Sequence, residues 1–160
     1  MTIVFVTGMS GTGKSTALAE LARRGFEVLD TDYDGWSEEV PLGGGGFEQL
    51  WREDRIETLL AGHRSRPLFV SGTVANQVKF YPRFDAIVLL TVPLEVALAR
   101  IDVRTTNDFG KAPGERQRII DDHYRVEPLL RRGATDVIDS TQPPRDVADA
   151  LAAIAANGSG

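Results

Sequence analysis

The chain has 160 residues, of which 42% are hydrophobic and 26% charged, and its formal net charge is −5. This length and hydrophobic content favour one folded domain with a real core over a disordered chain. Because an acidic chain does not attract nucleic acid or anionic membranes broadly, we expect neither as a partner. The lack of cysteine excludes disulfides, thiol nucleophiles and cysteine-ligated metals.

The N-terminal stretch and the distribution of apolar residues predict the localisation of the protein. The N-terminal apolar stretch is short and has no basic flank, so we do not expect a secretory signal. No segment approaches the ~18 apolar residues that a membrane span needs. We therefore expect a soluble cytoplasmic protein, a monomer or weak homodimer, with one domain over 1–156 and a flexible tail at 157–160. His63 and His123 stand apart in the sequence, which argues against a histidine zinc site.

Strand and helix patterns alternate along the chain. Apolar runs predict strands at 2–7, 26–29, 67–71, 84–90 and 135–138. Amphipathic patterns predict helices at 15–24, 47–61, 93–103, 115–132 and 145–155. We expect a turn with a short helix at 72–80, and polar loops at 34–46 and 104–113. Strands separated by helices predict an α/β fold with a five-stranded parallel sheet flanked by helices, and ligands bind beyond the strand C-termini of such sheets.

Residues 8–15 read G-x-x-x-x-G-K-S between the first predicted strand and helix, which is the setting of a phosphate-binding loop. Glycines let the backbone approach an anion, and the turned amides form an anion-binding nest at the positive end of the helix. Lys14 supplies charge for the β- and γ-phosphates, and the Ser15 hydroxyl is a hard oxygen ligand for Mg²⁺. Thr16 either touches the α-phosphate or only begins the helix. The loop predicts that the protein binds ATP and Mg²⁺.

Asp30 and Asp32 follow the second predicted strand, on the expected ligand side of the sheet. Two residues apart in extended chain, their carboxylates point the same way. Phosphoryl transfer needs one group for the metal and its water shell and another to orient or deprotonate the attacking hydroxyl. Asp30 is the candidate metal residue and Asp32 the candidate catalytic residue, with Asp34 a weaker third. The alternative is an acidic loop whose aspartates cap a helix.

These motifs resemble the small P-loop kinases, and shikimate kinases most closely, which carry an aspartate–Ser/Thr–aspartate motif after the second strand. The resemblance implies a three-layer P-loop kinase fold in which Asp30 serves the metal and Asp32 contacts the acceptor hydroxyl. Residues 71–73 then match the family's glycine-rich substrate turn, 94–113 its pre-lid helix and lid, and 137–141 its closing strand and adenine-side loop.

The chain departs from the family at its acceptor side. The family's substrate turn has three glycines, of which only Gly72 is present, and residues 104–111 lack the arginine–proline pair of its lid. Arg52, Arg55 and Arg125 lie near the places of the family's carboxylate-binding arginines, but each is offset. The resemblance therefore implies the kinase chemistry without implying shikimate as the acceptor.

Transfer of a γ-phosphoryl group spreads negative charge over its equatorial oxygens. A cation that arrives when a lid closes over the site can stabilise this charge. Arg100 and Arg104 are four residues apart and share one helix face. Arg104 is the candidate catalytic lid cation, whereas Arg100 either stacks on adenine, braces the lid or is a solvated arginine. The predicted nucleotide-binding residues are Gly8, Met9, Ser10, Gly11, Thr12, Gly13, Lys14, Ser15, Thr16 and Arg100; Ser15 and Asp30 are predicted to hold the metal.

Residues 33–66 form the expected acceptor-binding region. Trp36 and Trp51 either wall the acceptor or pack in the core, and the four glycines at 43–46 form either a flap or a tolerant surface loop. Asn76 and Gln77, after the substrate turn, are candidates to hydrogen-bond a polar acceptor.

The leading functional prediction is a kinase of a small hydroxylated molecule. A nucleoside or nucleoside monophosphate kinase is an alternative, with Arg52, Arg55 and Arg64 available for the acceptor phosphate. A regulatory module that uses the loop as a switch is a second alternative, which the paired aspartates disfavour. A kinase of nucleic-acid ends is disfavoured by the acidic charge.

Overall fold

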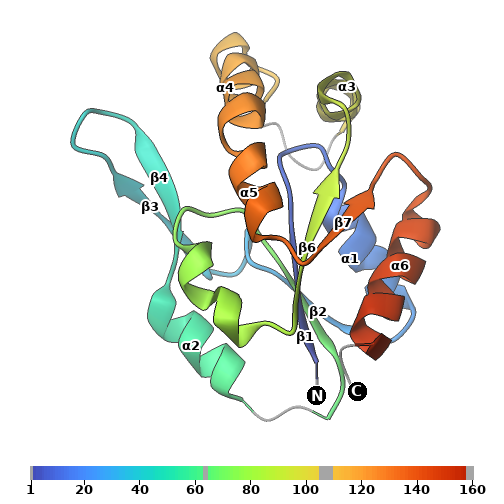
Figure 1. The fold of residues 1–160 in the computed structure, drawn as a ribbon. Helices are drawn as coiled ribbons and strands as arrows, with labels where there is room; N and C mark the ends of the chain where they lie inside the picture. Colours follow the sequence, from blue (N-terminus) through green and yellow to red (C-terminus); the bar gives the residue numbers. More distant parts are fainter. Residues whose placement is uncertain (1, 63–64, 105–109, 158–160) are drawn as a thin grey trace.

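A computed structural model describes residues 2–62, 65–104 and 110–157. Its centre is a sheet in the order β2–β5–β1–β6–β7, in which each strand runs parallel to its neighbours (Figure 1). The strands are β1 (Ile3–Thr7), β2 (Glu27–Asp30), β5 (Leu68–Ser71), β6 (Ala86–Thr91) and β7 (Asp136–Asp139). The predicted α/β fold with a five-stranded parallel sheet is confirmed.

Helices cover both faces of the sheet and complete the three layers. One face carries α1 (Lys14–Arg23) and α6 (Pro144–Asn157) (Figure 1). The other carries α2 (Glu53–Ala61), the 3-10 helix η1 (Gln77–Arg83) and α5 (Glu127–Gly133). Beyond the C-terminal edge of the sheet lie α3 (Leu94–Val103) and α4 (Pro113–Arg125).

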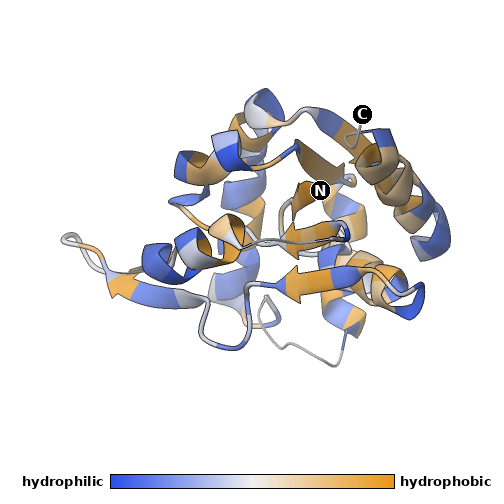
Figure 2. Cartoon of the chain, turned by 90° about the horizontal axis from the view of Figure 1, so that it is seen from below, coloured by the Kyte–Doolittle hydropathy of each residue, from blue (hydrophilic) through white to orange (hydrophobic). Residues whose placement is uncertain are grey.

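The central strands are apolar along their whole length because both of their faces are buried. Val4 and Val6 of β1 pack toward α1 and α6, whereas Phe5 between them packs with the aromatic cluster of the opposite face. Figure 2 shows the hydrophobic strands inside and hydrophilic residues on the outer helix surfaces. Within the described residues, none of the helices has the length and apolar character needed to cross a membrane.

The predicted loop at 34–46 is wrong, and the predicted helix at 47–61 is confirmed only over 53–61. Here β3 (Ser37–Pro41) and β4 (Phe47–Trp51) form an antiparallel hairpin that projects from the body of the molecule, and the helix begins only at Glu53 (Figure 1). Gly45 and Gly46 have φ of 96° and 82°, a conformation that glycine adopts without steric cost, and so they allow the tight turn at the tip. The spacing of Trp51, Leu59 and Leu60 had suggested one helix, but Trp51 is buried at the end of a strand.

The predicted helix at 115–132 is two helices, α4 and α5, with a break at Val126. Pro128 has no amide hydrogen and cannot continue the ladder of the preceding helix, so a new helix begins beside it. The short helix expected within 72–80 is displaced to η1. His63, Arg64, the lid residues 105–109 and the tail residues 158–160 lie outside the described residues.

Gly11 provides a test of how closely the phosphate-binding loop packs on α3. A Cβ at Gly11 would lie 2.6 Å from the Ala97 carbonyl oxygen, whereas one at Gly25 would have nothing within 4 Å, although both glycines have φ near 80–90°. Gly25→Ala should lower the free energy of unfolding by about 1 kcal/mol for the left-handed conformation alone, and Gly11→Ala by about 2–4 kcal/mol because a clash is added. Urea unfolding measures both, and equal losses would contradict the tight packing.

Candidate active site

The loop between β1 and α1 is held in a shape that turns its backbone inward. Gly11 and Gly13 have φ of 82° and 89°, and Gly13 directly precedes α1. The Thr12 hydroxyl donates to the Met9 carbonyl at 2.8 Å and closes the loop on itself. The Met9 side chain points away into a cluster with Leu89 and Leu130. The packing of Met9 and the hydrogen bond of Thr12 therefore hold the loop in one shape, as a preformed anion nest requires.

Lys14 lies across the loop. Its Nζ donates to the carbonyl oxygens of Gly8 at 2.7 Å and Met9 at 3.1 Å. Burial lowers the pKa of Lys14 to about 8, against the charges of Asp32 and Asp30, which raise that pKa, while the charge of Arg104 lowers it further. The two candidate acids and the candidate lid cation therefore all lie within electrostatic reach of this ammonium group.

Asp30 and Ser15 meet at the C-terminal edge of the sheet. The Ser15 hydroxyl donates to Asp30 Oδ2 at 2.9 Å, and the Asp32 amide donates to Asp30 Oδ1 at 3.0 Å. Burial raises the pKa of the Asp32 carboxyl, the negative charge of Asp30 raises it further, and Lys14 opposes both. A pair of hard oxygens thus lies beside a carboxylate of increased proton affinity.

This oxygen pair fits Mg²⁺ bound together with a nucleotide. Mg²⁺ usually takes one or two protein oxygens and completes its shell with water and phosphate oxygens. Within the described parts of the chain, no group of three or more His, Cys, Asp or Glu side chains could hold a metal by itself. Ser15 and Asp30 therefore suit a metal that arrives with phosphates better than a metal caged by protein alone.

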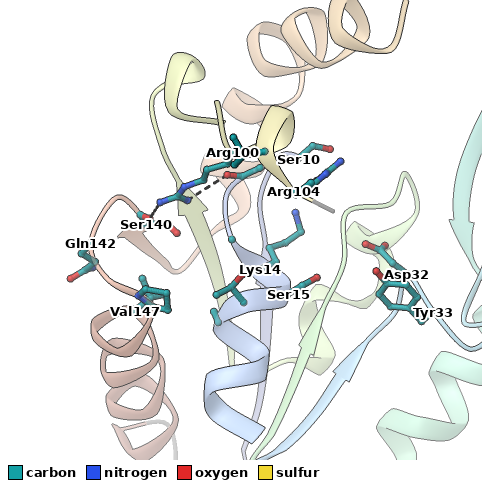
Figure 3. A pocket seen from close by; sticks show the side chains of 16 residues that line it. Ser10, Lys14, Ser15, Asp32, Tyr33, Arg100, Arg104, Ser140, Gln142 and Val147 are labelled. Carbon is teal, nitrogen blue, oxygen red and sulfur yellow. Dashed lines mark hydrogen bonds between the residues drawn. The ribbon is translucent and has the colours of Figure 1, made fainter. Parts of the chain in front are cut away.

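A cavity of about 440 Å³ opens beside the loop, between α1, the end of α3 and the start of α6 (Figure 3). Asp32 and Tyr33 lie at one side of it, and Arg100, Ser140, Gln142 and Val147 at the other. This volume is within the range of small-molecule and cofactor sites. The residues that line the cavity are Ser10, Gly11, Gly13, Lys14, Ser15, Thr16, Ala17, Asp32, Tyr33, Arg100, Val103, Arg104, Ser140, Gln142, Pro144 and Val147.

Arg100 joins the loop to the opposite wall of the cavity. Its Nη2 donates to the Ser140 carbonyl at 2.7 Å, and its Nη1 approaches the Gly11 carbonyl at 3.4 Å (Figure 3). The Ser140 hydroxyl donates in turn to the Thr12 carbonyl. These contacts give Arg100 a role that the sequence analysis did not consider, as a brace between the phosphate-binding loop and the segment after β7.

The predicted site residues divide into lining and support. Nine of them line the cavity, namely Ser10, Gly11, Gly13, Lys14, Ser15, Thr16, Asp32, Arg100 and Arg104. Gly8, Met9 and Thr12 support the loop through their backbone or packing, and Asp30 reaches the site through Ser15.

Sequence reasoning missed Ala17, Tyr33, Val103, Gln142, Pro144 and Val147, which also line the cavity. Tyr33 directly follows Asp32, so adjacency was a usable signal. Ser140 lies in the segment that the family resemblance had marked as the adenine side. Val147 lies on the distant helix α6, and only the folded packing brings it to the loop.

The candidate acceptor residues mostly contact one another. Trp51 is fully buried, and the Arg55 guanidinium stacks over the Trp36 ring at 4.1 Å. Asn76 Oδ1 accepts from the Trp51 amide at 2.8 Å, while the buried Gln77 side chain donates to Tyr81 at 2.9 Å. These contacts assign Trp51, Asn76 and Gln77 to internal packing rather than to the acceptor.

Comparison with known proteins identifies the family. A family model described as the AAA domain matches residues 4–121, and the chain belongs to that family. No curated protein matches the sequence.

Solved structures that resemble this chain include several kinases, with which it shares the small P-loop kinase fold. Shikimate kinase from Acinetobacter baumannii in complex with shikimate is 19% identical with a TM-score of 0.63, covering 95% of this chain and 91% of the other. Shikimate kinase from Bacteroides thetaiotaomicron is 14% identical with a TM-score of 0.62, and the match covers 96% of this chain and 97% of the other. Deoxyadenosine kinase from M. mycoides with bound dATP is 15% identical with a TM-score of 0.59, and the match covers 94% of this chain and 97% of the other.

The lowered pKa of Lys14 predicts that ADP binding takes up protons. With a pKa of about 8, Lys14 is about three-quarters uncharged at pH 8.5 in the free protein and almost fully charged at pH 7. Phosphate oxygens favour the ammonium form and raise the pKa, so binding should take up about 0.7 proton at pH 8.5 and close to none at pH 7. Calorimetric titration in buffers of different ionisation enthalpy measures the uptake.

The matched control is Lys79→Met. Lys79 is an exposed lysine paired with Glu53 at 3.1 Å, and its removal should leave the uptake unchanged. Binding enthalpies at pH 8.5 that do not depend on the buffer would contradict the prediction.

Proposed function

We propose that the protein is an ATP-dependent phosphotransferase that moves the γ-phosphoryl group of Mg-ATP to a hydroxyl or phosphate of a small-molecule acceptor. The observation that carries this proposal is the meeting of Lys14, the Ser15–Asp30 pair and Asp32 around one cavity. Each supplies a part that phosphoryl transfer needs: a phosphate cation, a metal anchor and a group for the acceptor.

The nucleotide lies along the cavity in this proposal. The amides of the loop and of the first turn of α1 receive the phosphates, and Lys14 leaves its contacts with the Gly8 and Met9 carbonyls to reach them. The base occupies the side bounded by Arg100, Ser140 and Val147. The Arg100 brace keeps that wall at a fixed distance from the loop.

Ser15 and Asp30, whose side-chain oxygens lie 2.9 Å apart, would hold Mg²⁺. When bound, the metal would supply positive charge against the charge that develops on the phosphates during transfer. Arg104, which lines the cavity at the end of α3, adds a second positive charge close to Lys14. Three cations around the phosphates, namely Mg²⁺, Lys14 and Arg104, would stabilise the transition state more than a single lysine could.

Asp32 orients the acceptor hydroxyl and accepts its proton. Its raised pKa makes the ionised carboxylate a stronger base than an exposed aspartate, which suits removal of a proton as the new P–O bond forms. Its side chain lines the same cavity as Lys14, next to Tyr33 (Figure 3), and we place the acceptor at this side of the cavity. We assign acceptor binding to residues 33–66 and closure to a lid at 104–113, as parts of one domain over 1–156.

A nucleoside or nucleoside monophosphate acceptor is the second candidate, because deoxyadenosine kinase from M. mycoides shares the fold. A monophosphate acceptor would need cations for its phosphate. Arg52 lies 3.7 Å from Glu38, and Arg55 stacks on Trp36 and donates to the Asp34 carbonyl at 2.9 Å. Both of these arginines are engaged elsewhere, which favours an acceptor without a phosphate of its own; Arg64, the third candidate, lies outside the described residues.

Asp32→Asn tests the proposed chemistry. The amide keeps the shape of the side chain but cannot accept the hydroxyl proton, so transfer should fall by about 100-fold or more while the Kd for Mg-ADP stays within about twofold. The assay is ³¹P NMR of Mg-ATP incubated with sugars, shikimate-like acids, nucleosides, nucleoside monophosphates and aminoglycoside-type compounds, scored for a new phosphoester signal.

Asp121→Asn is the matched control, since Asp121 is exposed on α4 and does not line the cavity. It should transfer at close to the wild-type rate. Transfer by Asp32→Asn at the wild-type rate would remove Asp32 from the mechanism, and no product from any acceptor would count against the kinase itself.

A further inference from the structure

Thr31, between the two candidate acids, is fully buried and held by four hydrogen bonds. Its amide and its hydroxyl both donate to the Ser71 carbonyl, at 3.0 and 2.8 Å. Its hydroxyl accepts from Trp51 Nε1 at 2.8 Å, and its carbonyl accepts from the Ser37 hydroxyl at 2.8 Å. Strand β5 therefore holds this residue from one side, and the base of the β3–β4 hairpin holds it from the other.

The space around Thr31 leaves it no room to shift. A Cβ on Gly72 would lie 2.3 Å from the Thr31 hydroxyl oxygen and 3.3 Å from Trp51 Nε1. Only a residue without a side chain permits this approach, which gives Gly72 a packing role. The hydrogen bond from Trp51 to Thr31 is thus enclosed on the side of the substrate turn as well.

Trp51 is itself fixed by its ring and by its backbone. Its ring packs edge-on against Phe5 at 5.2 Å and Phe80 at 5.7 Å between centroids. Its amide donates to Asn76 Oδ1 at 2.8 Å, and its carbonyl accepts from Asn76 Nδ2 at 3.1 Å. The indole N–H therefore presents a rigid donor to Thr31 from the aromatic core.

Holding Thr31 constrains the two residues attached to it. The chain here is not extended as the sequence pattern predicted: β2 ends at Asp30, and Thr31 and Asp32 form a turn in which the Tyr33 amide donates to the Asp30 carbonyl at 3.3 Å. Thr31 is buried within this turn, so fixing it also fixes the backbone from which Asp30 and Asp32 project. Asp30 then meets the Ser15 hydroxyl at 2.9 Å, and Asp32 lines the cavity. Neither Trp51 nor Ser37 lines the cavity, so both act through Thr31.

We propose that Thr31, Trp51 and Ser37 form a clamp through which the base of the β3–β4 hairpin positions Asp30 for the metal and Asp32 for the acceptor. This inference rests on the proposed function, because it assigns positioning residues to that site. The phosphate-binding loop has its own anchors at Met9 and Arg100. Loosening the clamp should therefore weaken metal binding while leaving nucleotide binding without metal almost unchanged.

The test compares Thr31→Val with Thr31→Ser. Valine fills nearly the same volume but removes the hydroxyl that both donates and accepts, whereas serine keeps that hydroxyl. Calorimetric titration with ADP, with and without Mg²⁺, measures the gain in affinity that the metal provides. We expect Thr31→Val to lose at least threefold of that gain with metal-free ADP affinity within about twofold of wild type, and Thr31→Ser to keep most of it.

Trp51→Phe gives a second variant that keeps an aromatic ring in the core and removes the indole donor together with part of the buried ring volume. It should show the same metal-specific loss as Thr31→Val, and circular dichroism melting checks that both variants are folded. Trp36→Phe is the matched control, since Trp36 stacks on Arg55 outside the clamp. This control should bind ADP and Mg-ADP as wild type does.

The clamp would be overturned if Thr31→Val and Trp51→Phe kept the full metal-dependent gain, or if they lost ADP affinity equally with and without Mg²⁺. A wild-type protein that gained nothing from Mg²⁺ would overturn the proposed function, and the clamp would fall with it. The wild-type titration therefore separates the two failures.

Discussion

The proposed site depends on one constraint, which is that backbone amides of residues 8–15 stay available to an anion. Residues 8–15 meet it because three separate elements hold the loop open. Met9 anchors it below, Gly11 packs against the backbone of α3, and Arg100 and Ser140 connect its carbonyls to the segment after β7. A central strand followed directly by a helix places this loop at the C-terminal edge of the sheet, where ligands of such folds bind.

The position of the loop brings two basic and two acidic side chains close together in the site. Lys14 and Arg104 face Asp30 and Asp32 across a small, partly buried space, so the pKa values of Lys14 and Asp32 reflect these neighbouring charges as well as burial. Lys14 donates hydrogen bonds to two carbonyl oxygens of its own loop. A triphosphate would replace those weak acceptors with charged ones, and the site is therefore electrostatically prepared for an anion that brings a cation with it.

The sequence pattern predicted those features that depend on residues close together in the chain. The phosphate-binding loop, the paired aspartates and the apolar strands were all readable, because each depends on residues close in sequence. The hairpin was not, since the apolar spacing of Trp51, Leu59 and Leu60 also fits a helix and only burial against Phe5 and Phe80 decides for a strand. Val147 likewise joined the cavity only through packing of the last helix. The role of Thr31 was hidden because its partners lie 6 to 40 residues away.

The central claim is that one cavity receives a magnesium nucleotide, with its phosphates on the loop and its metal at Ser15 and Asp30. A crystal structure of the protein with Mg-ADP tests this most directly. The account predicts phosphate density against the amides of residues 11–15, metal density at the Ser15 and Asp30 oxygens, and base density beside Arg100 and Val147. Nucleotide density elsewhere on the molecule, or none at millimolar Mg-ADP, would contradict it.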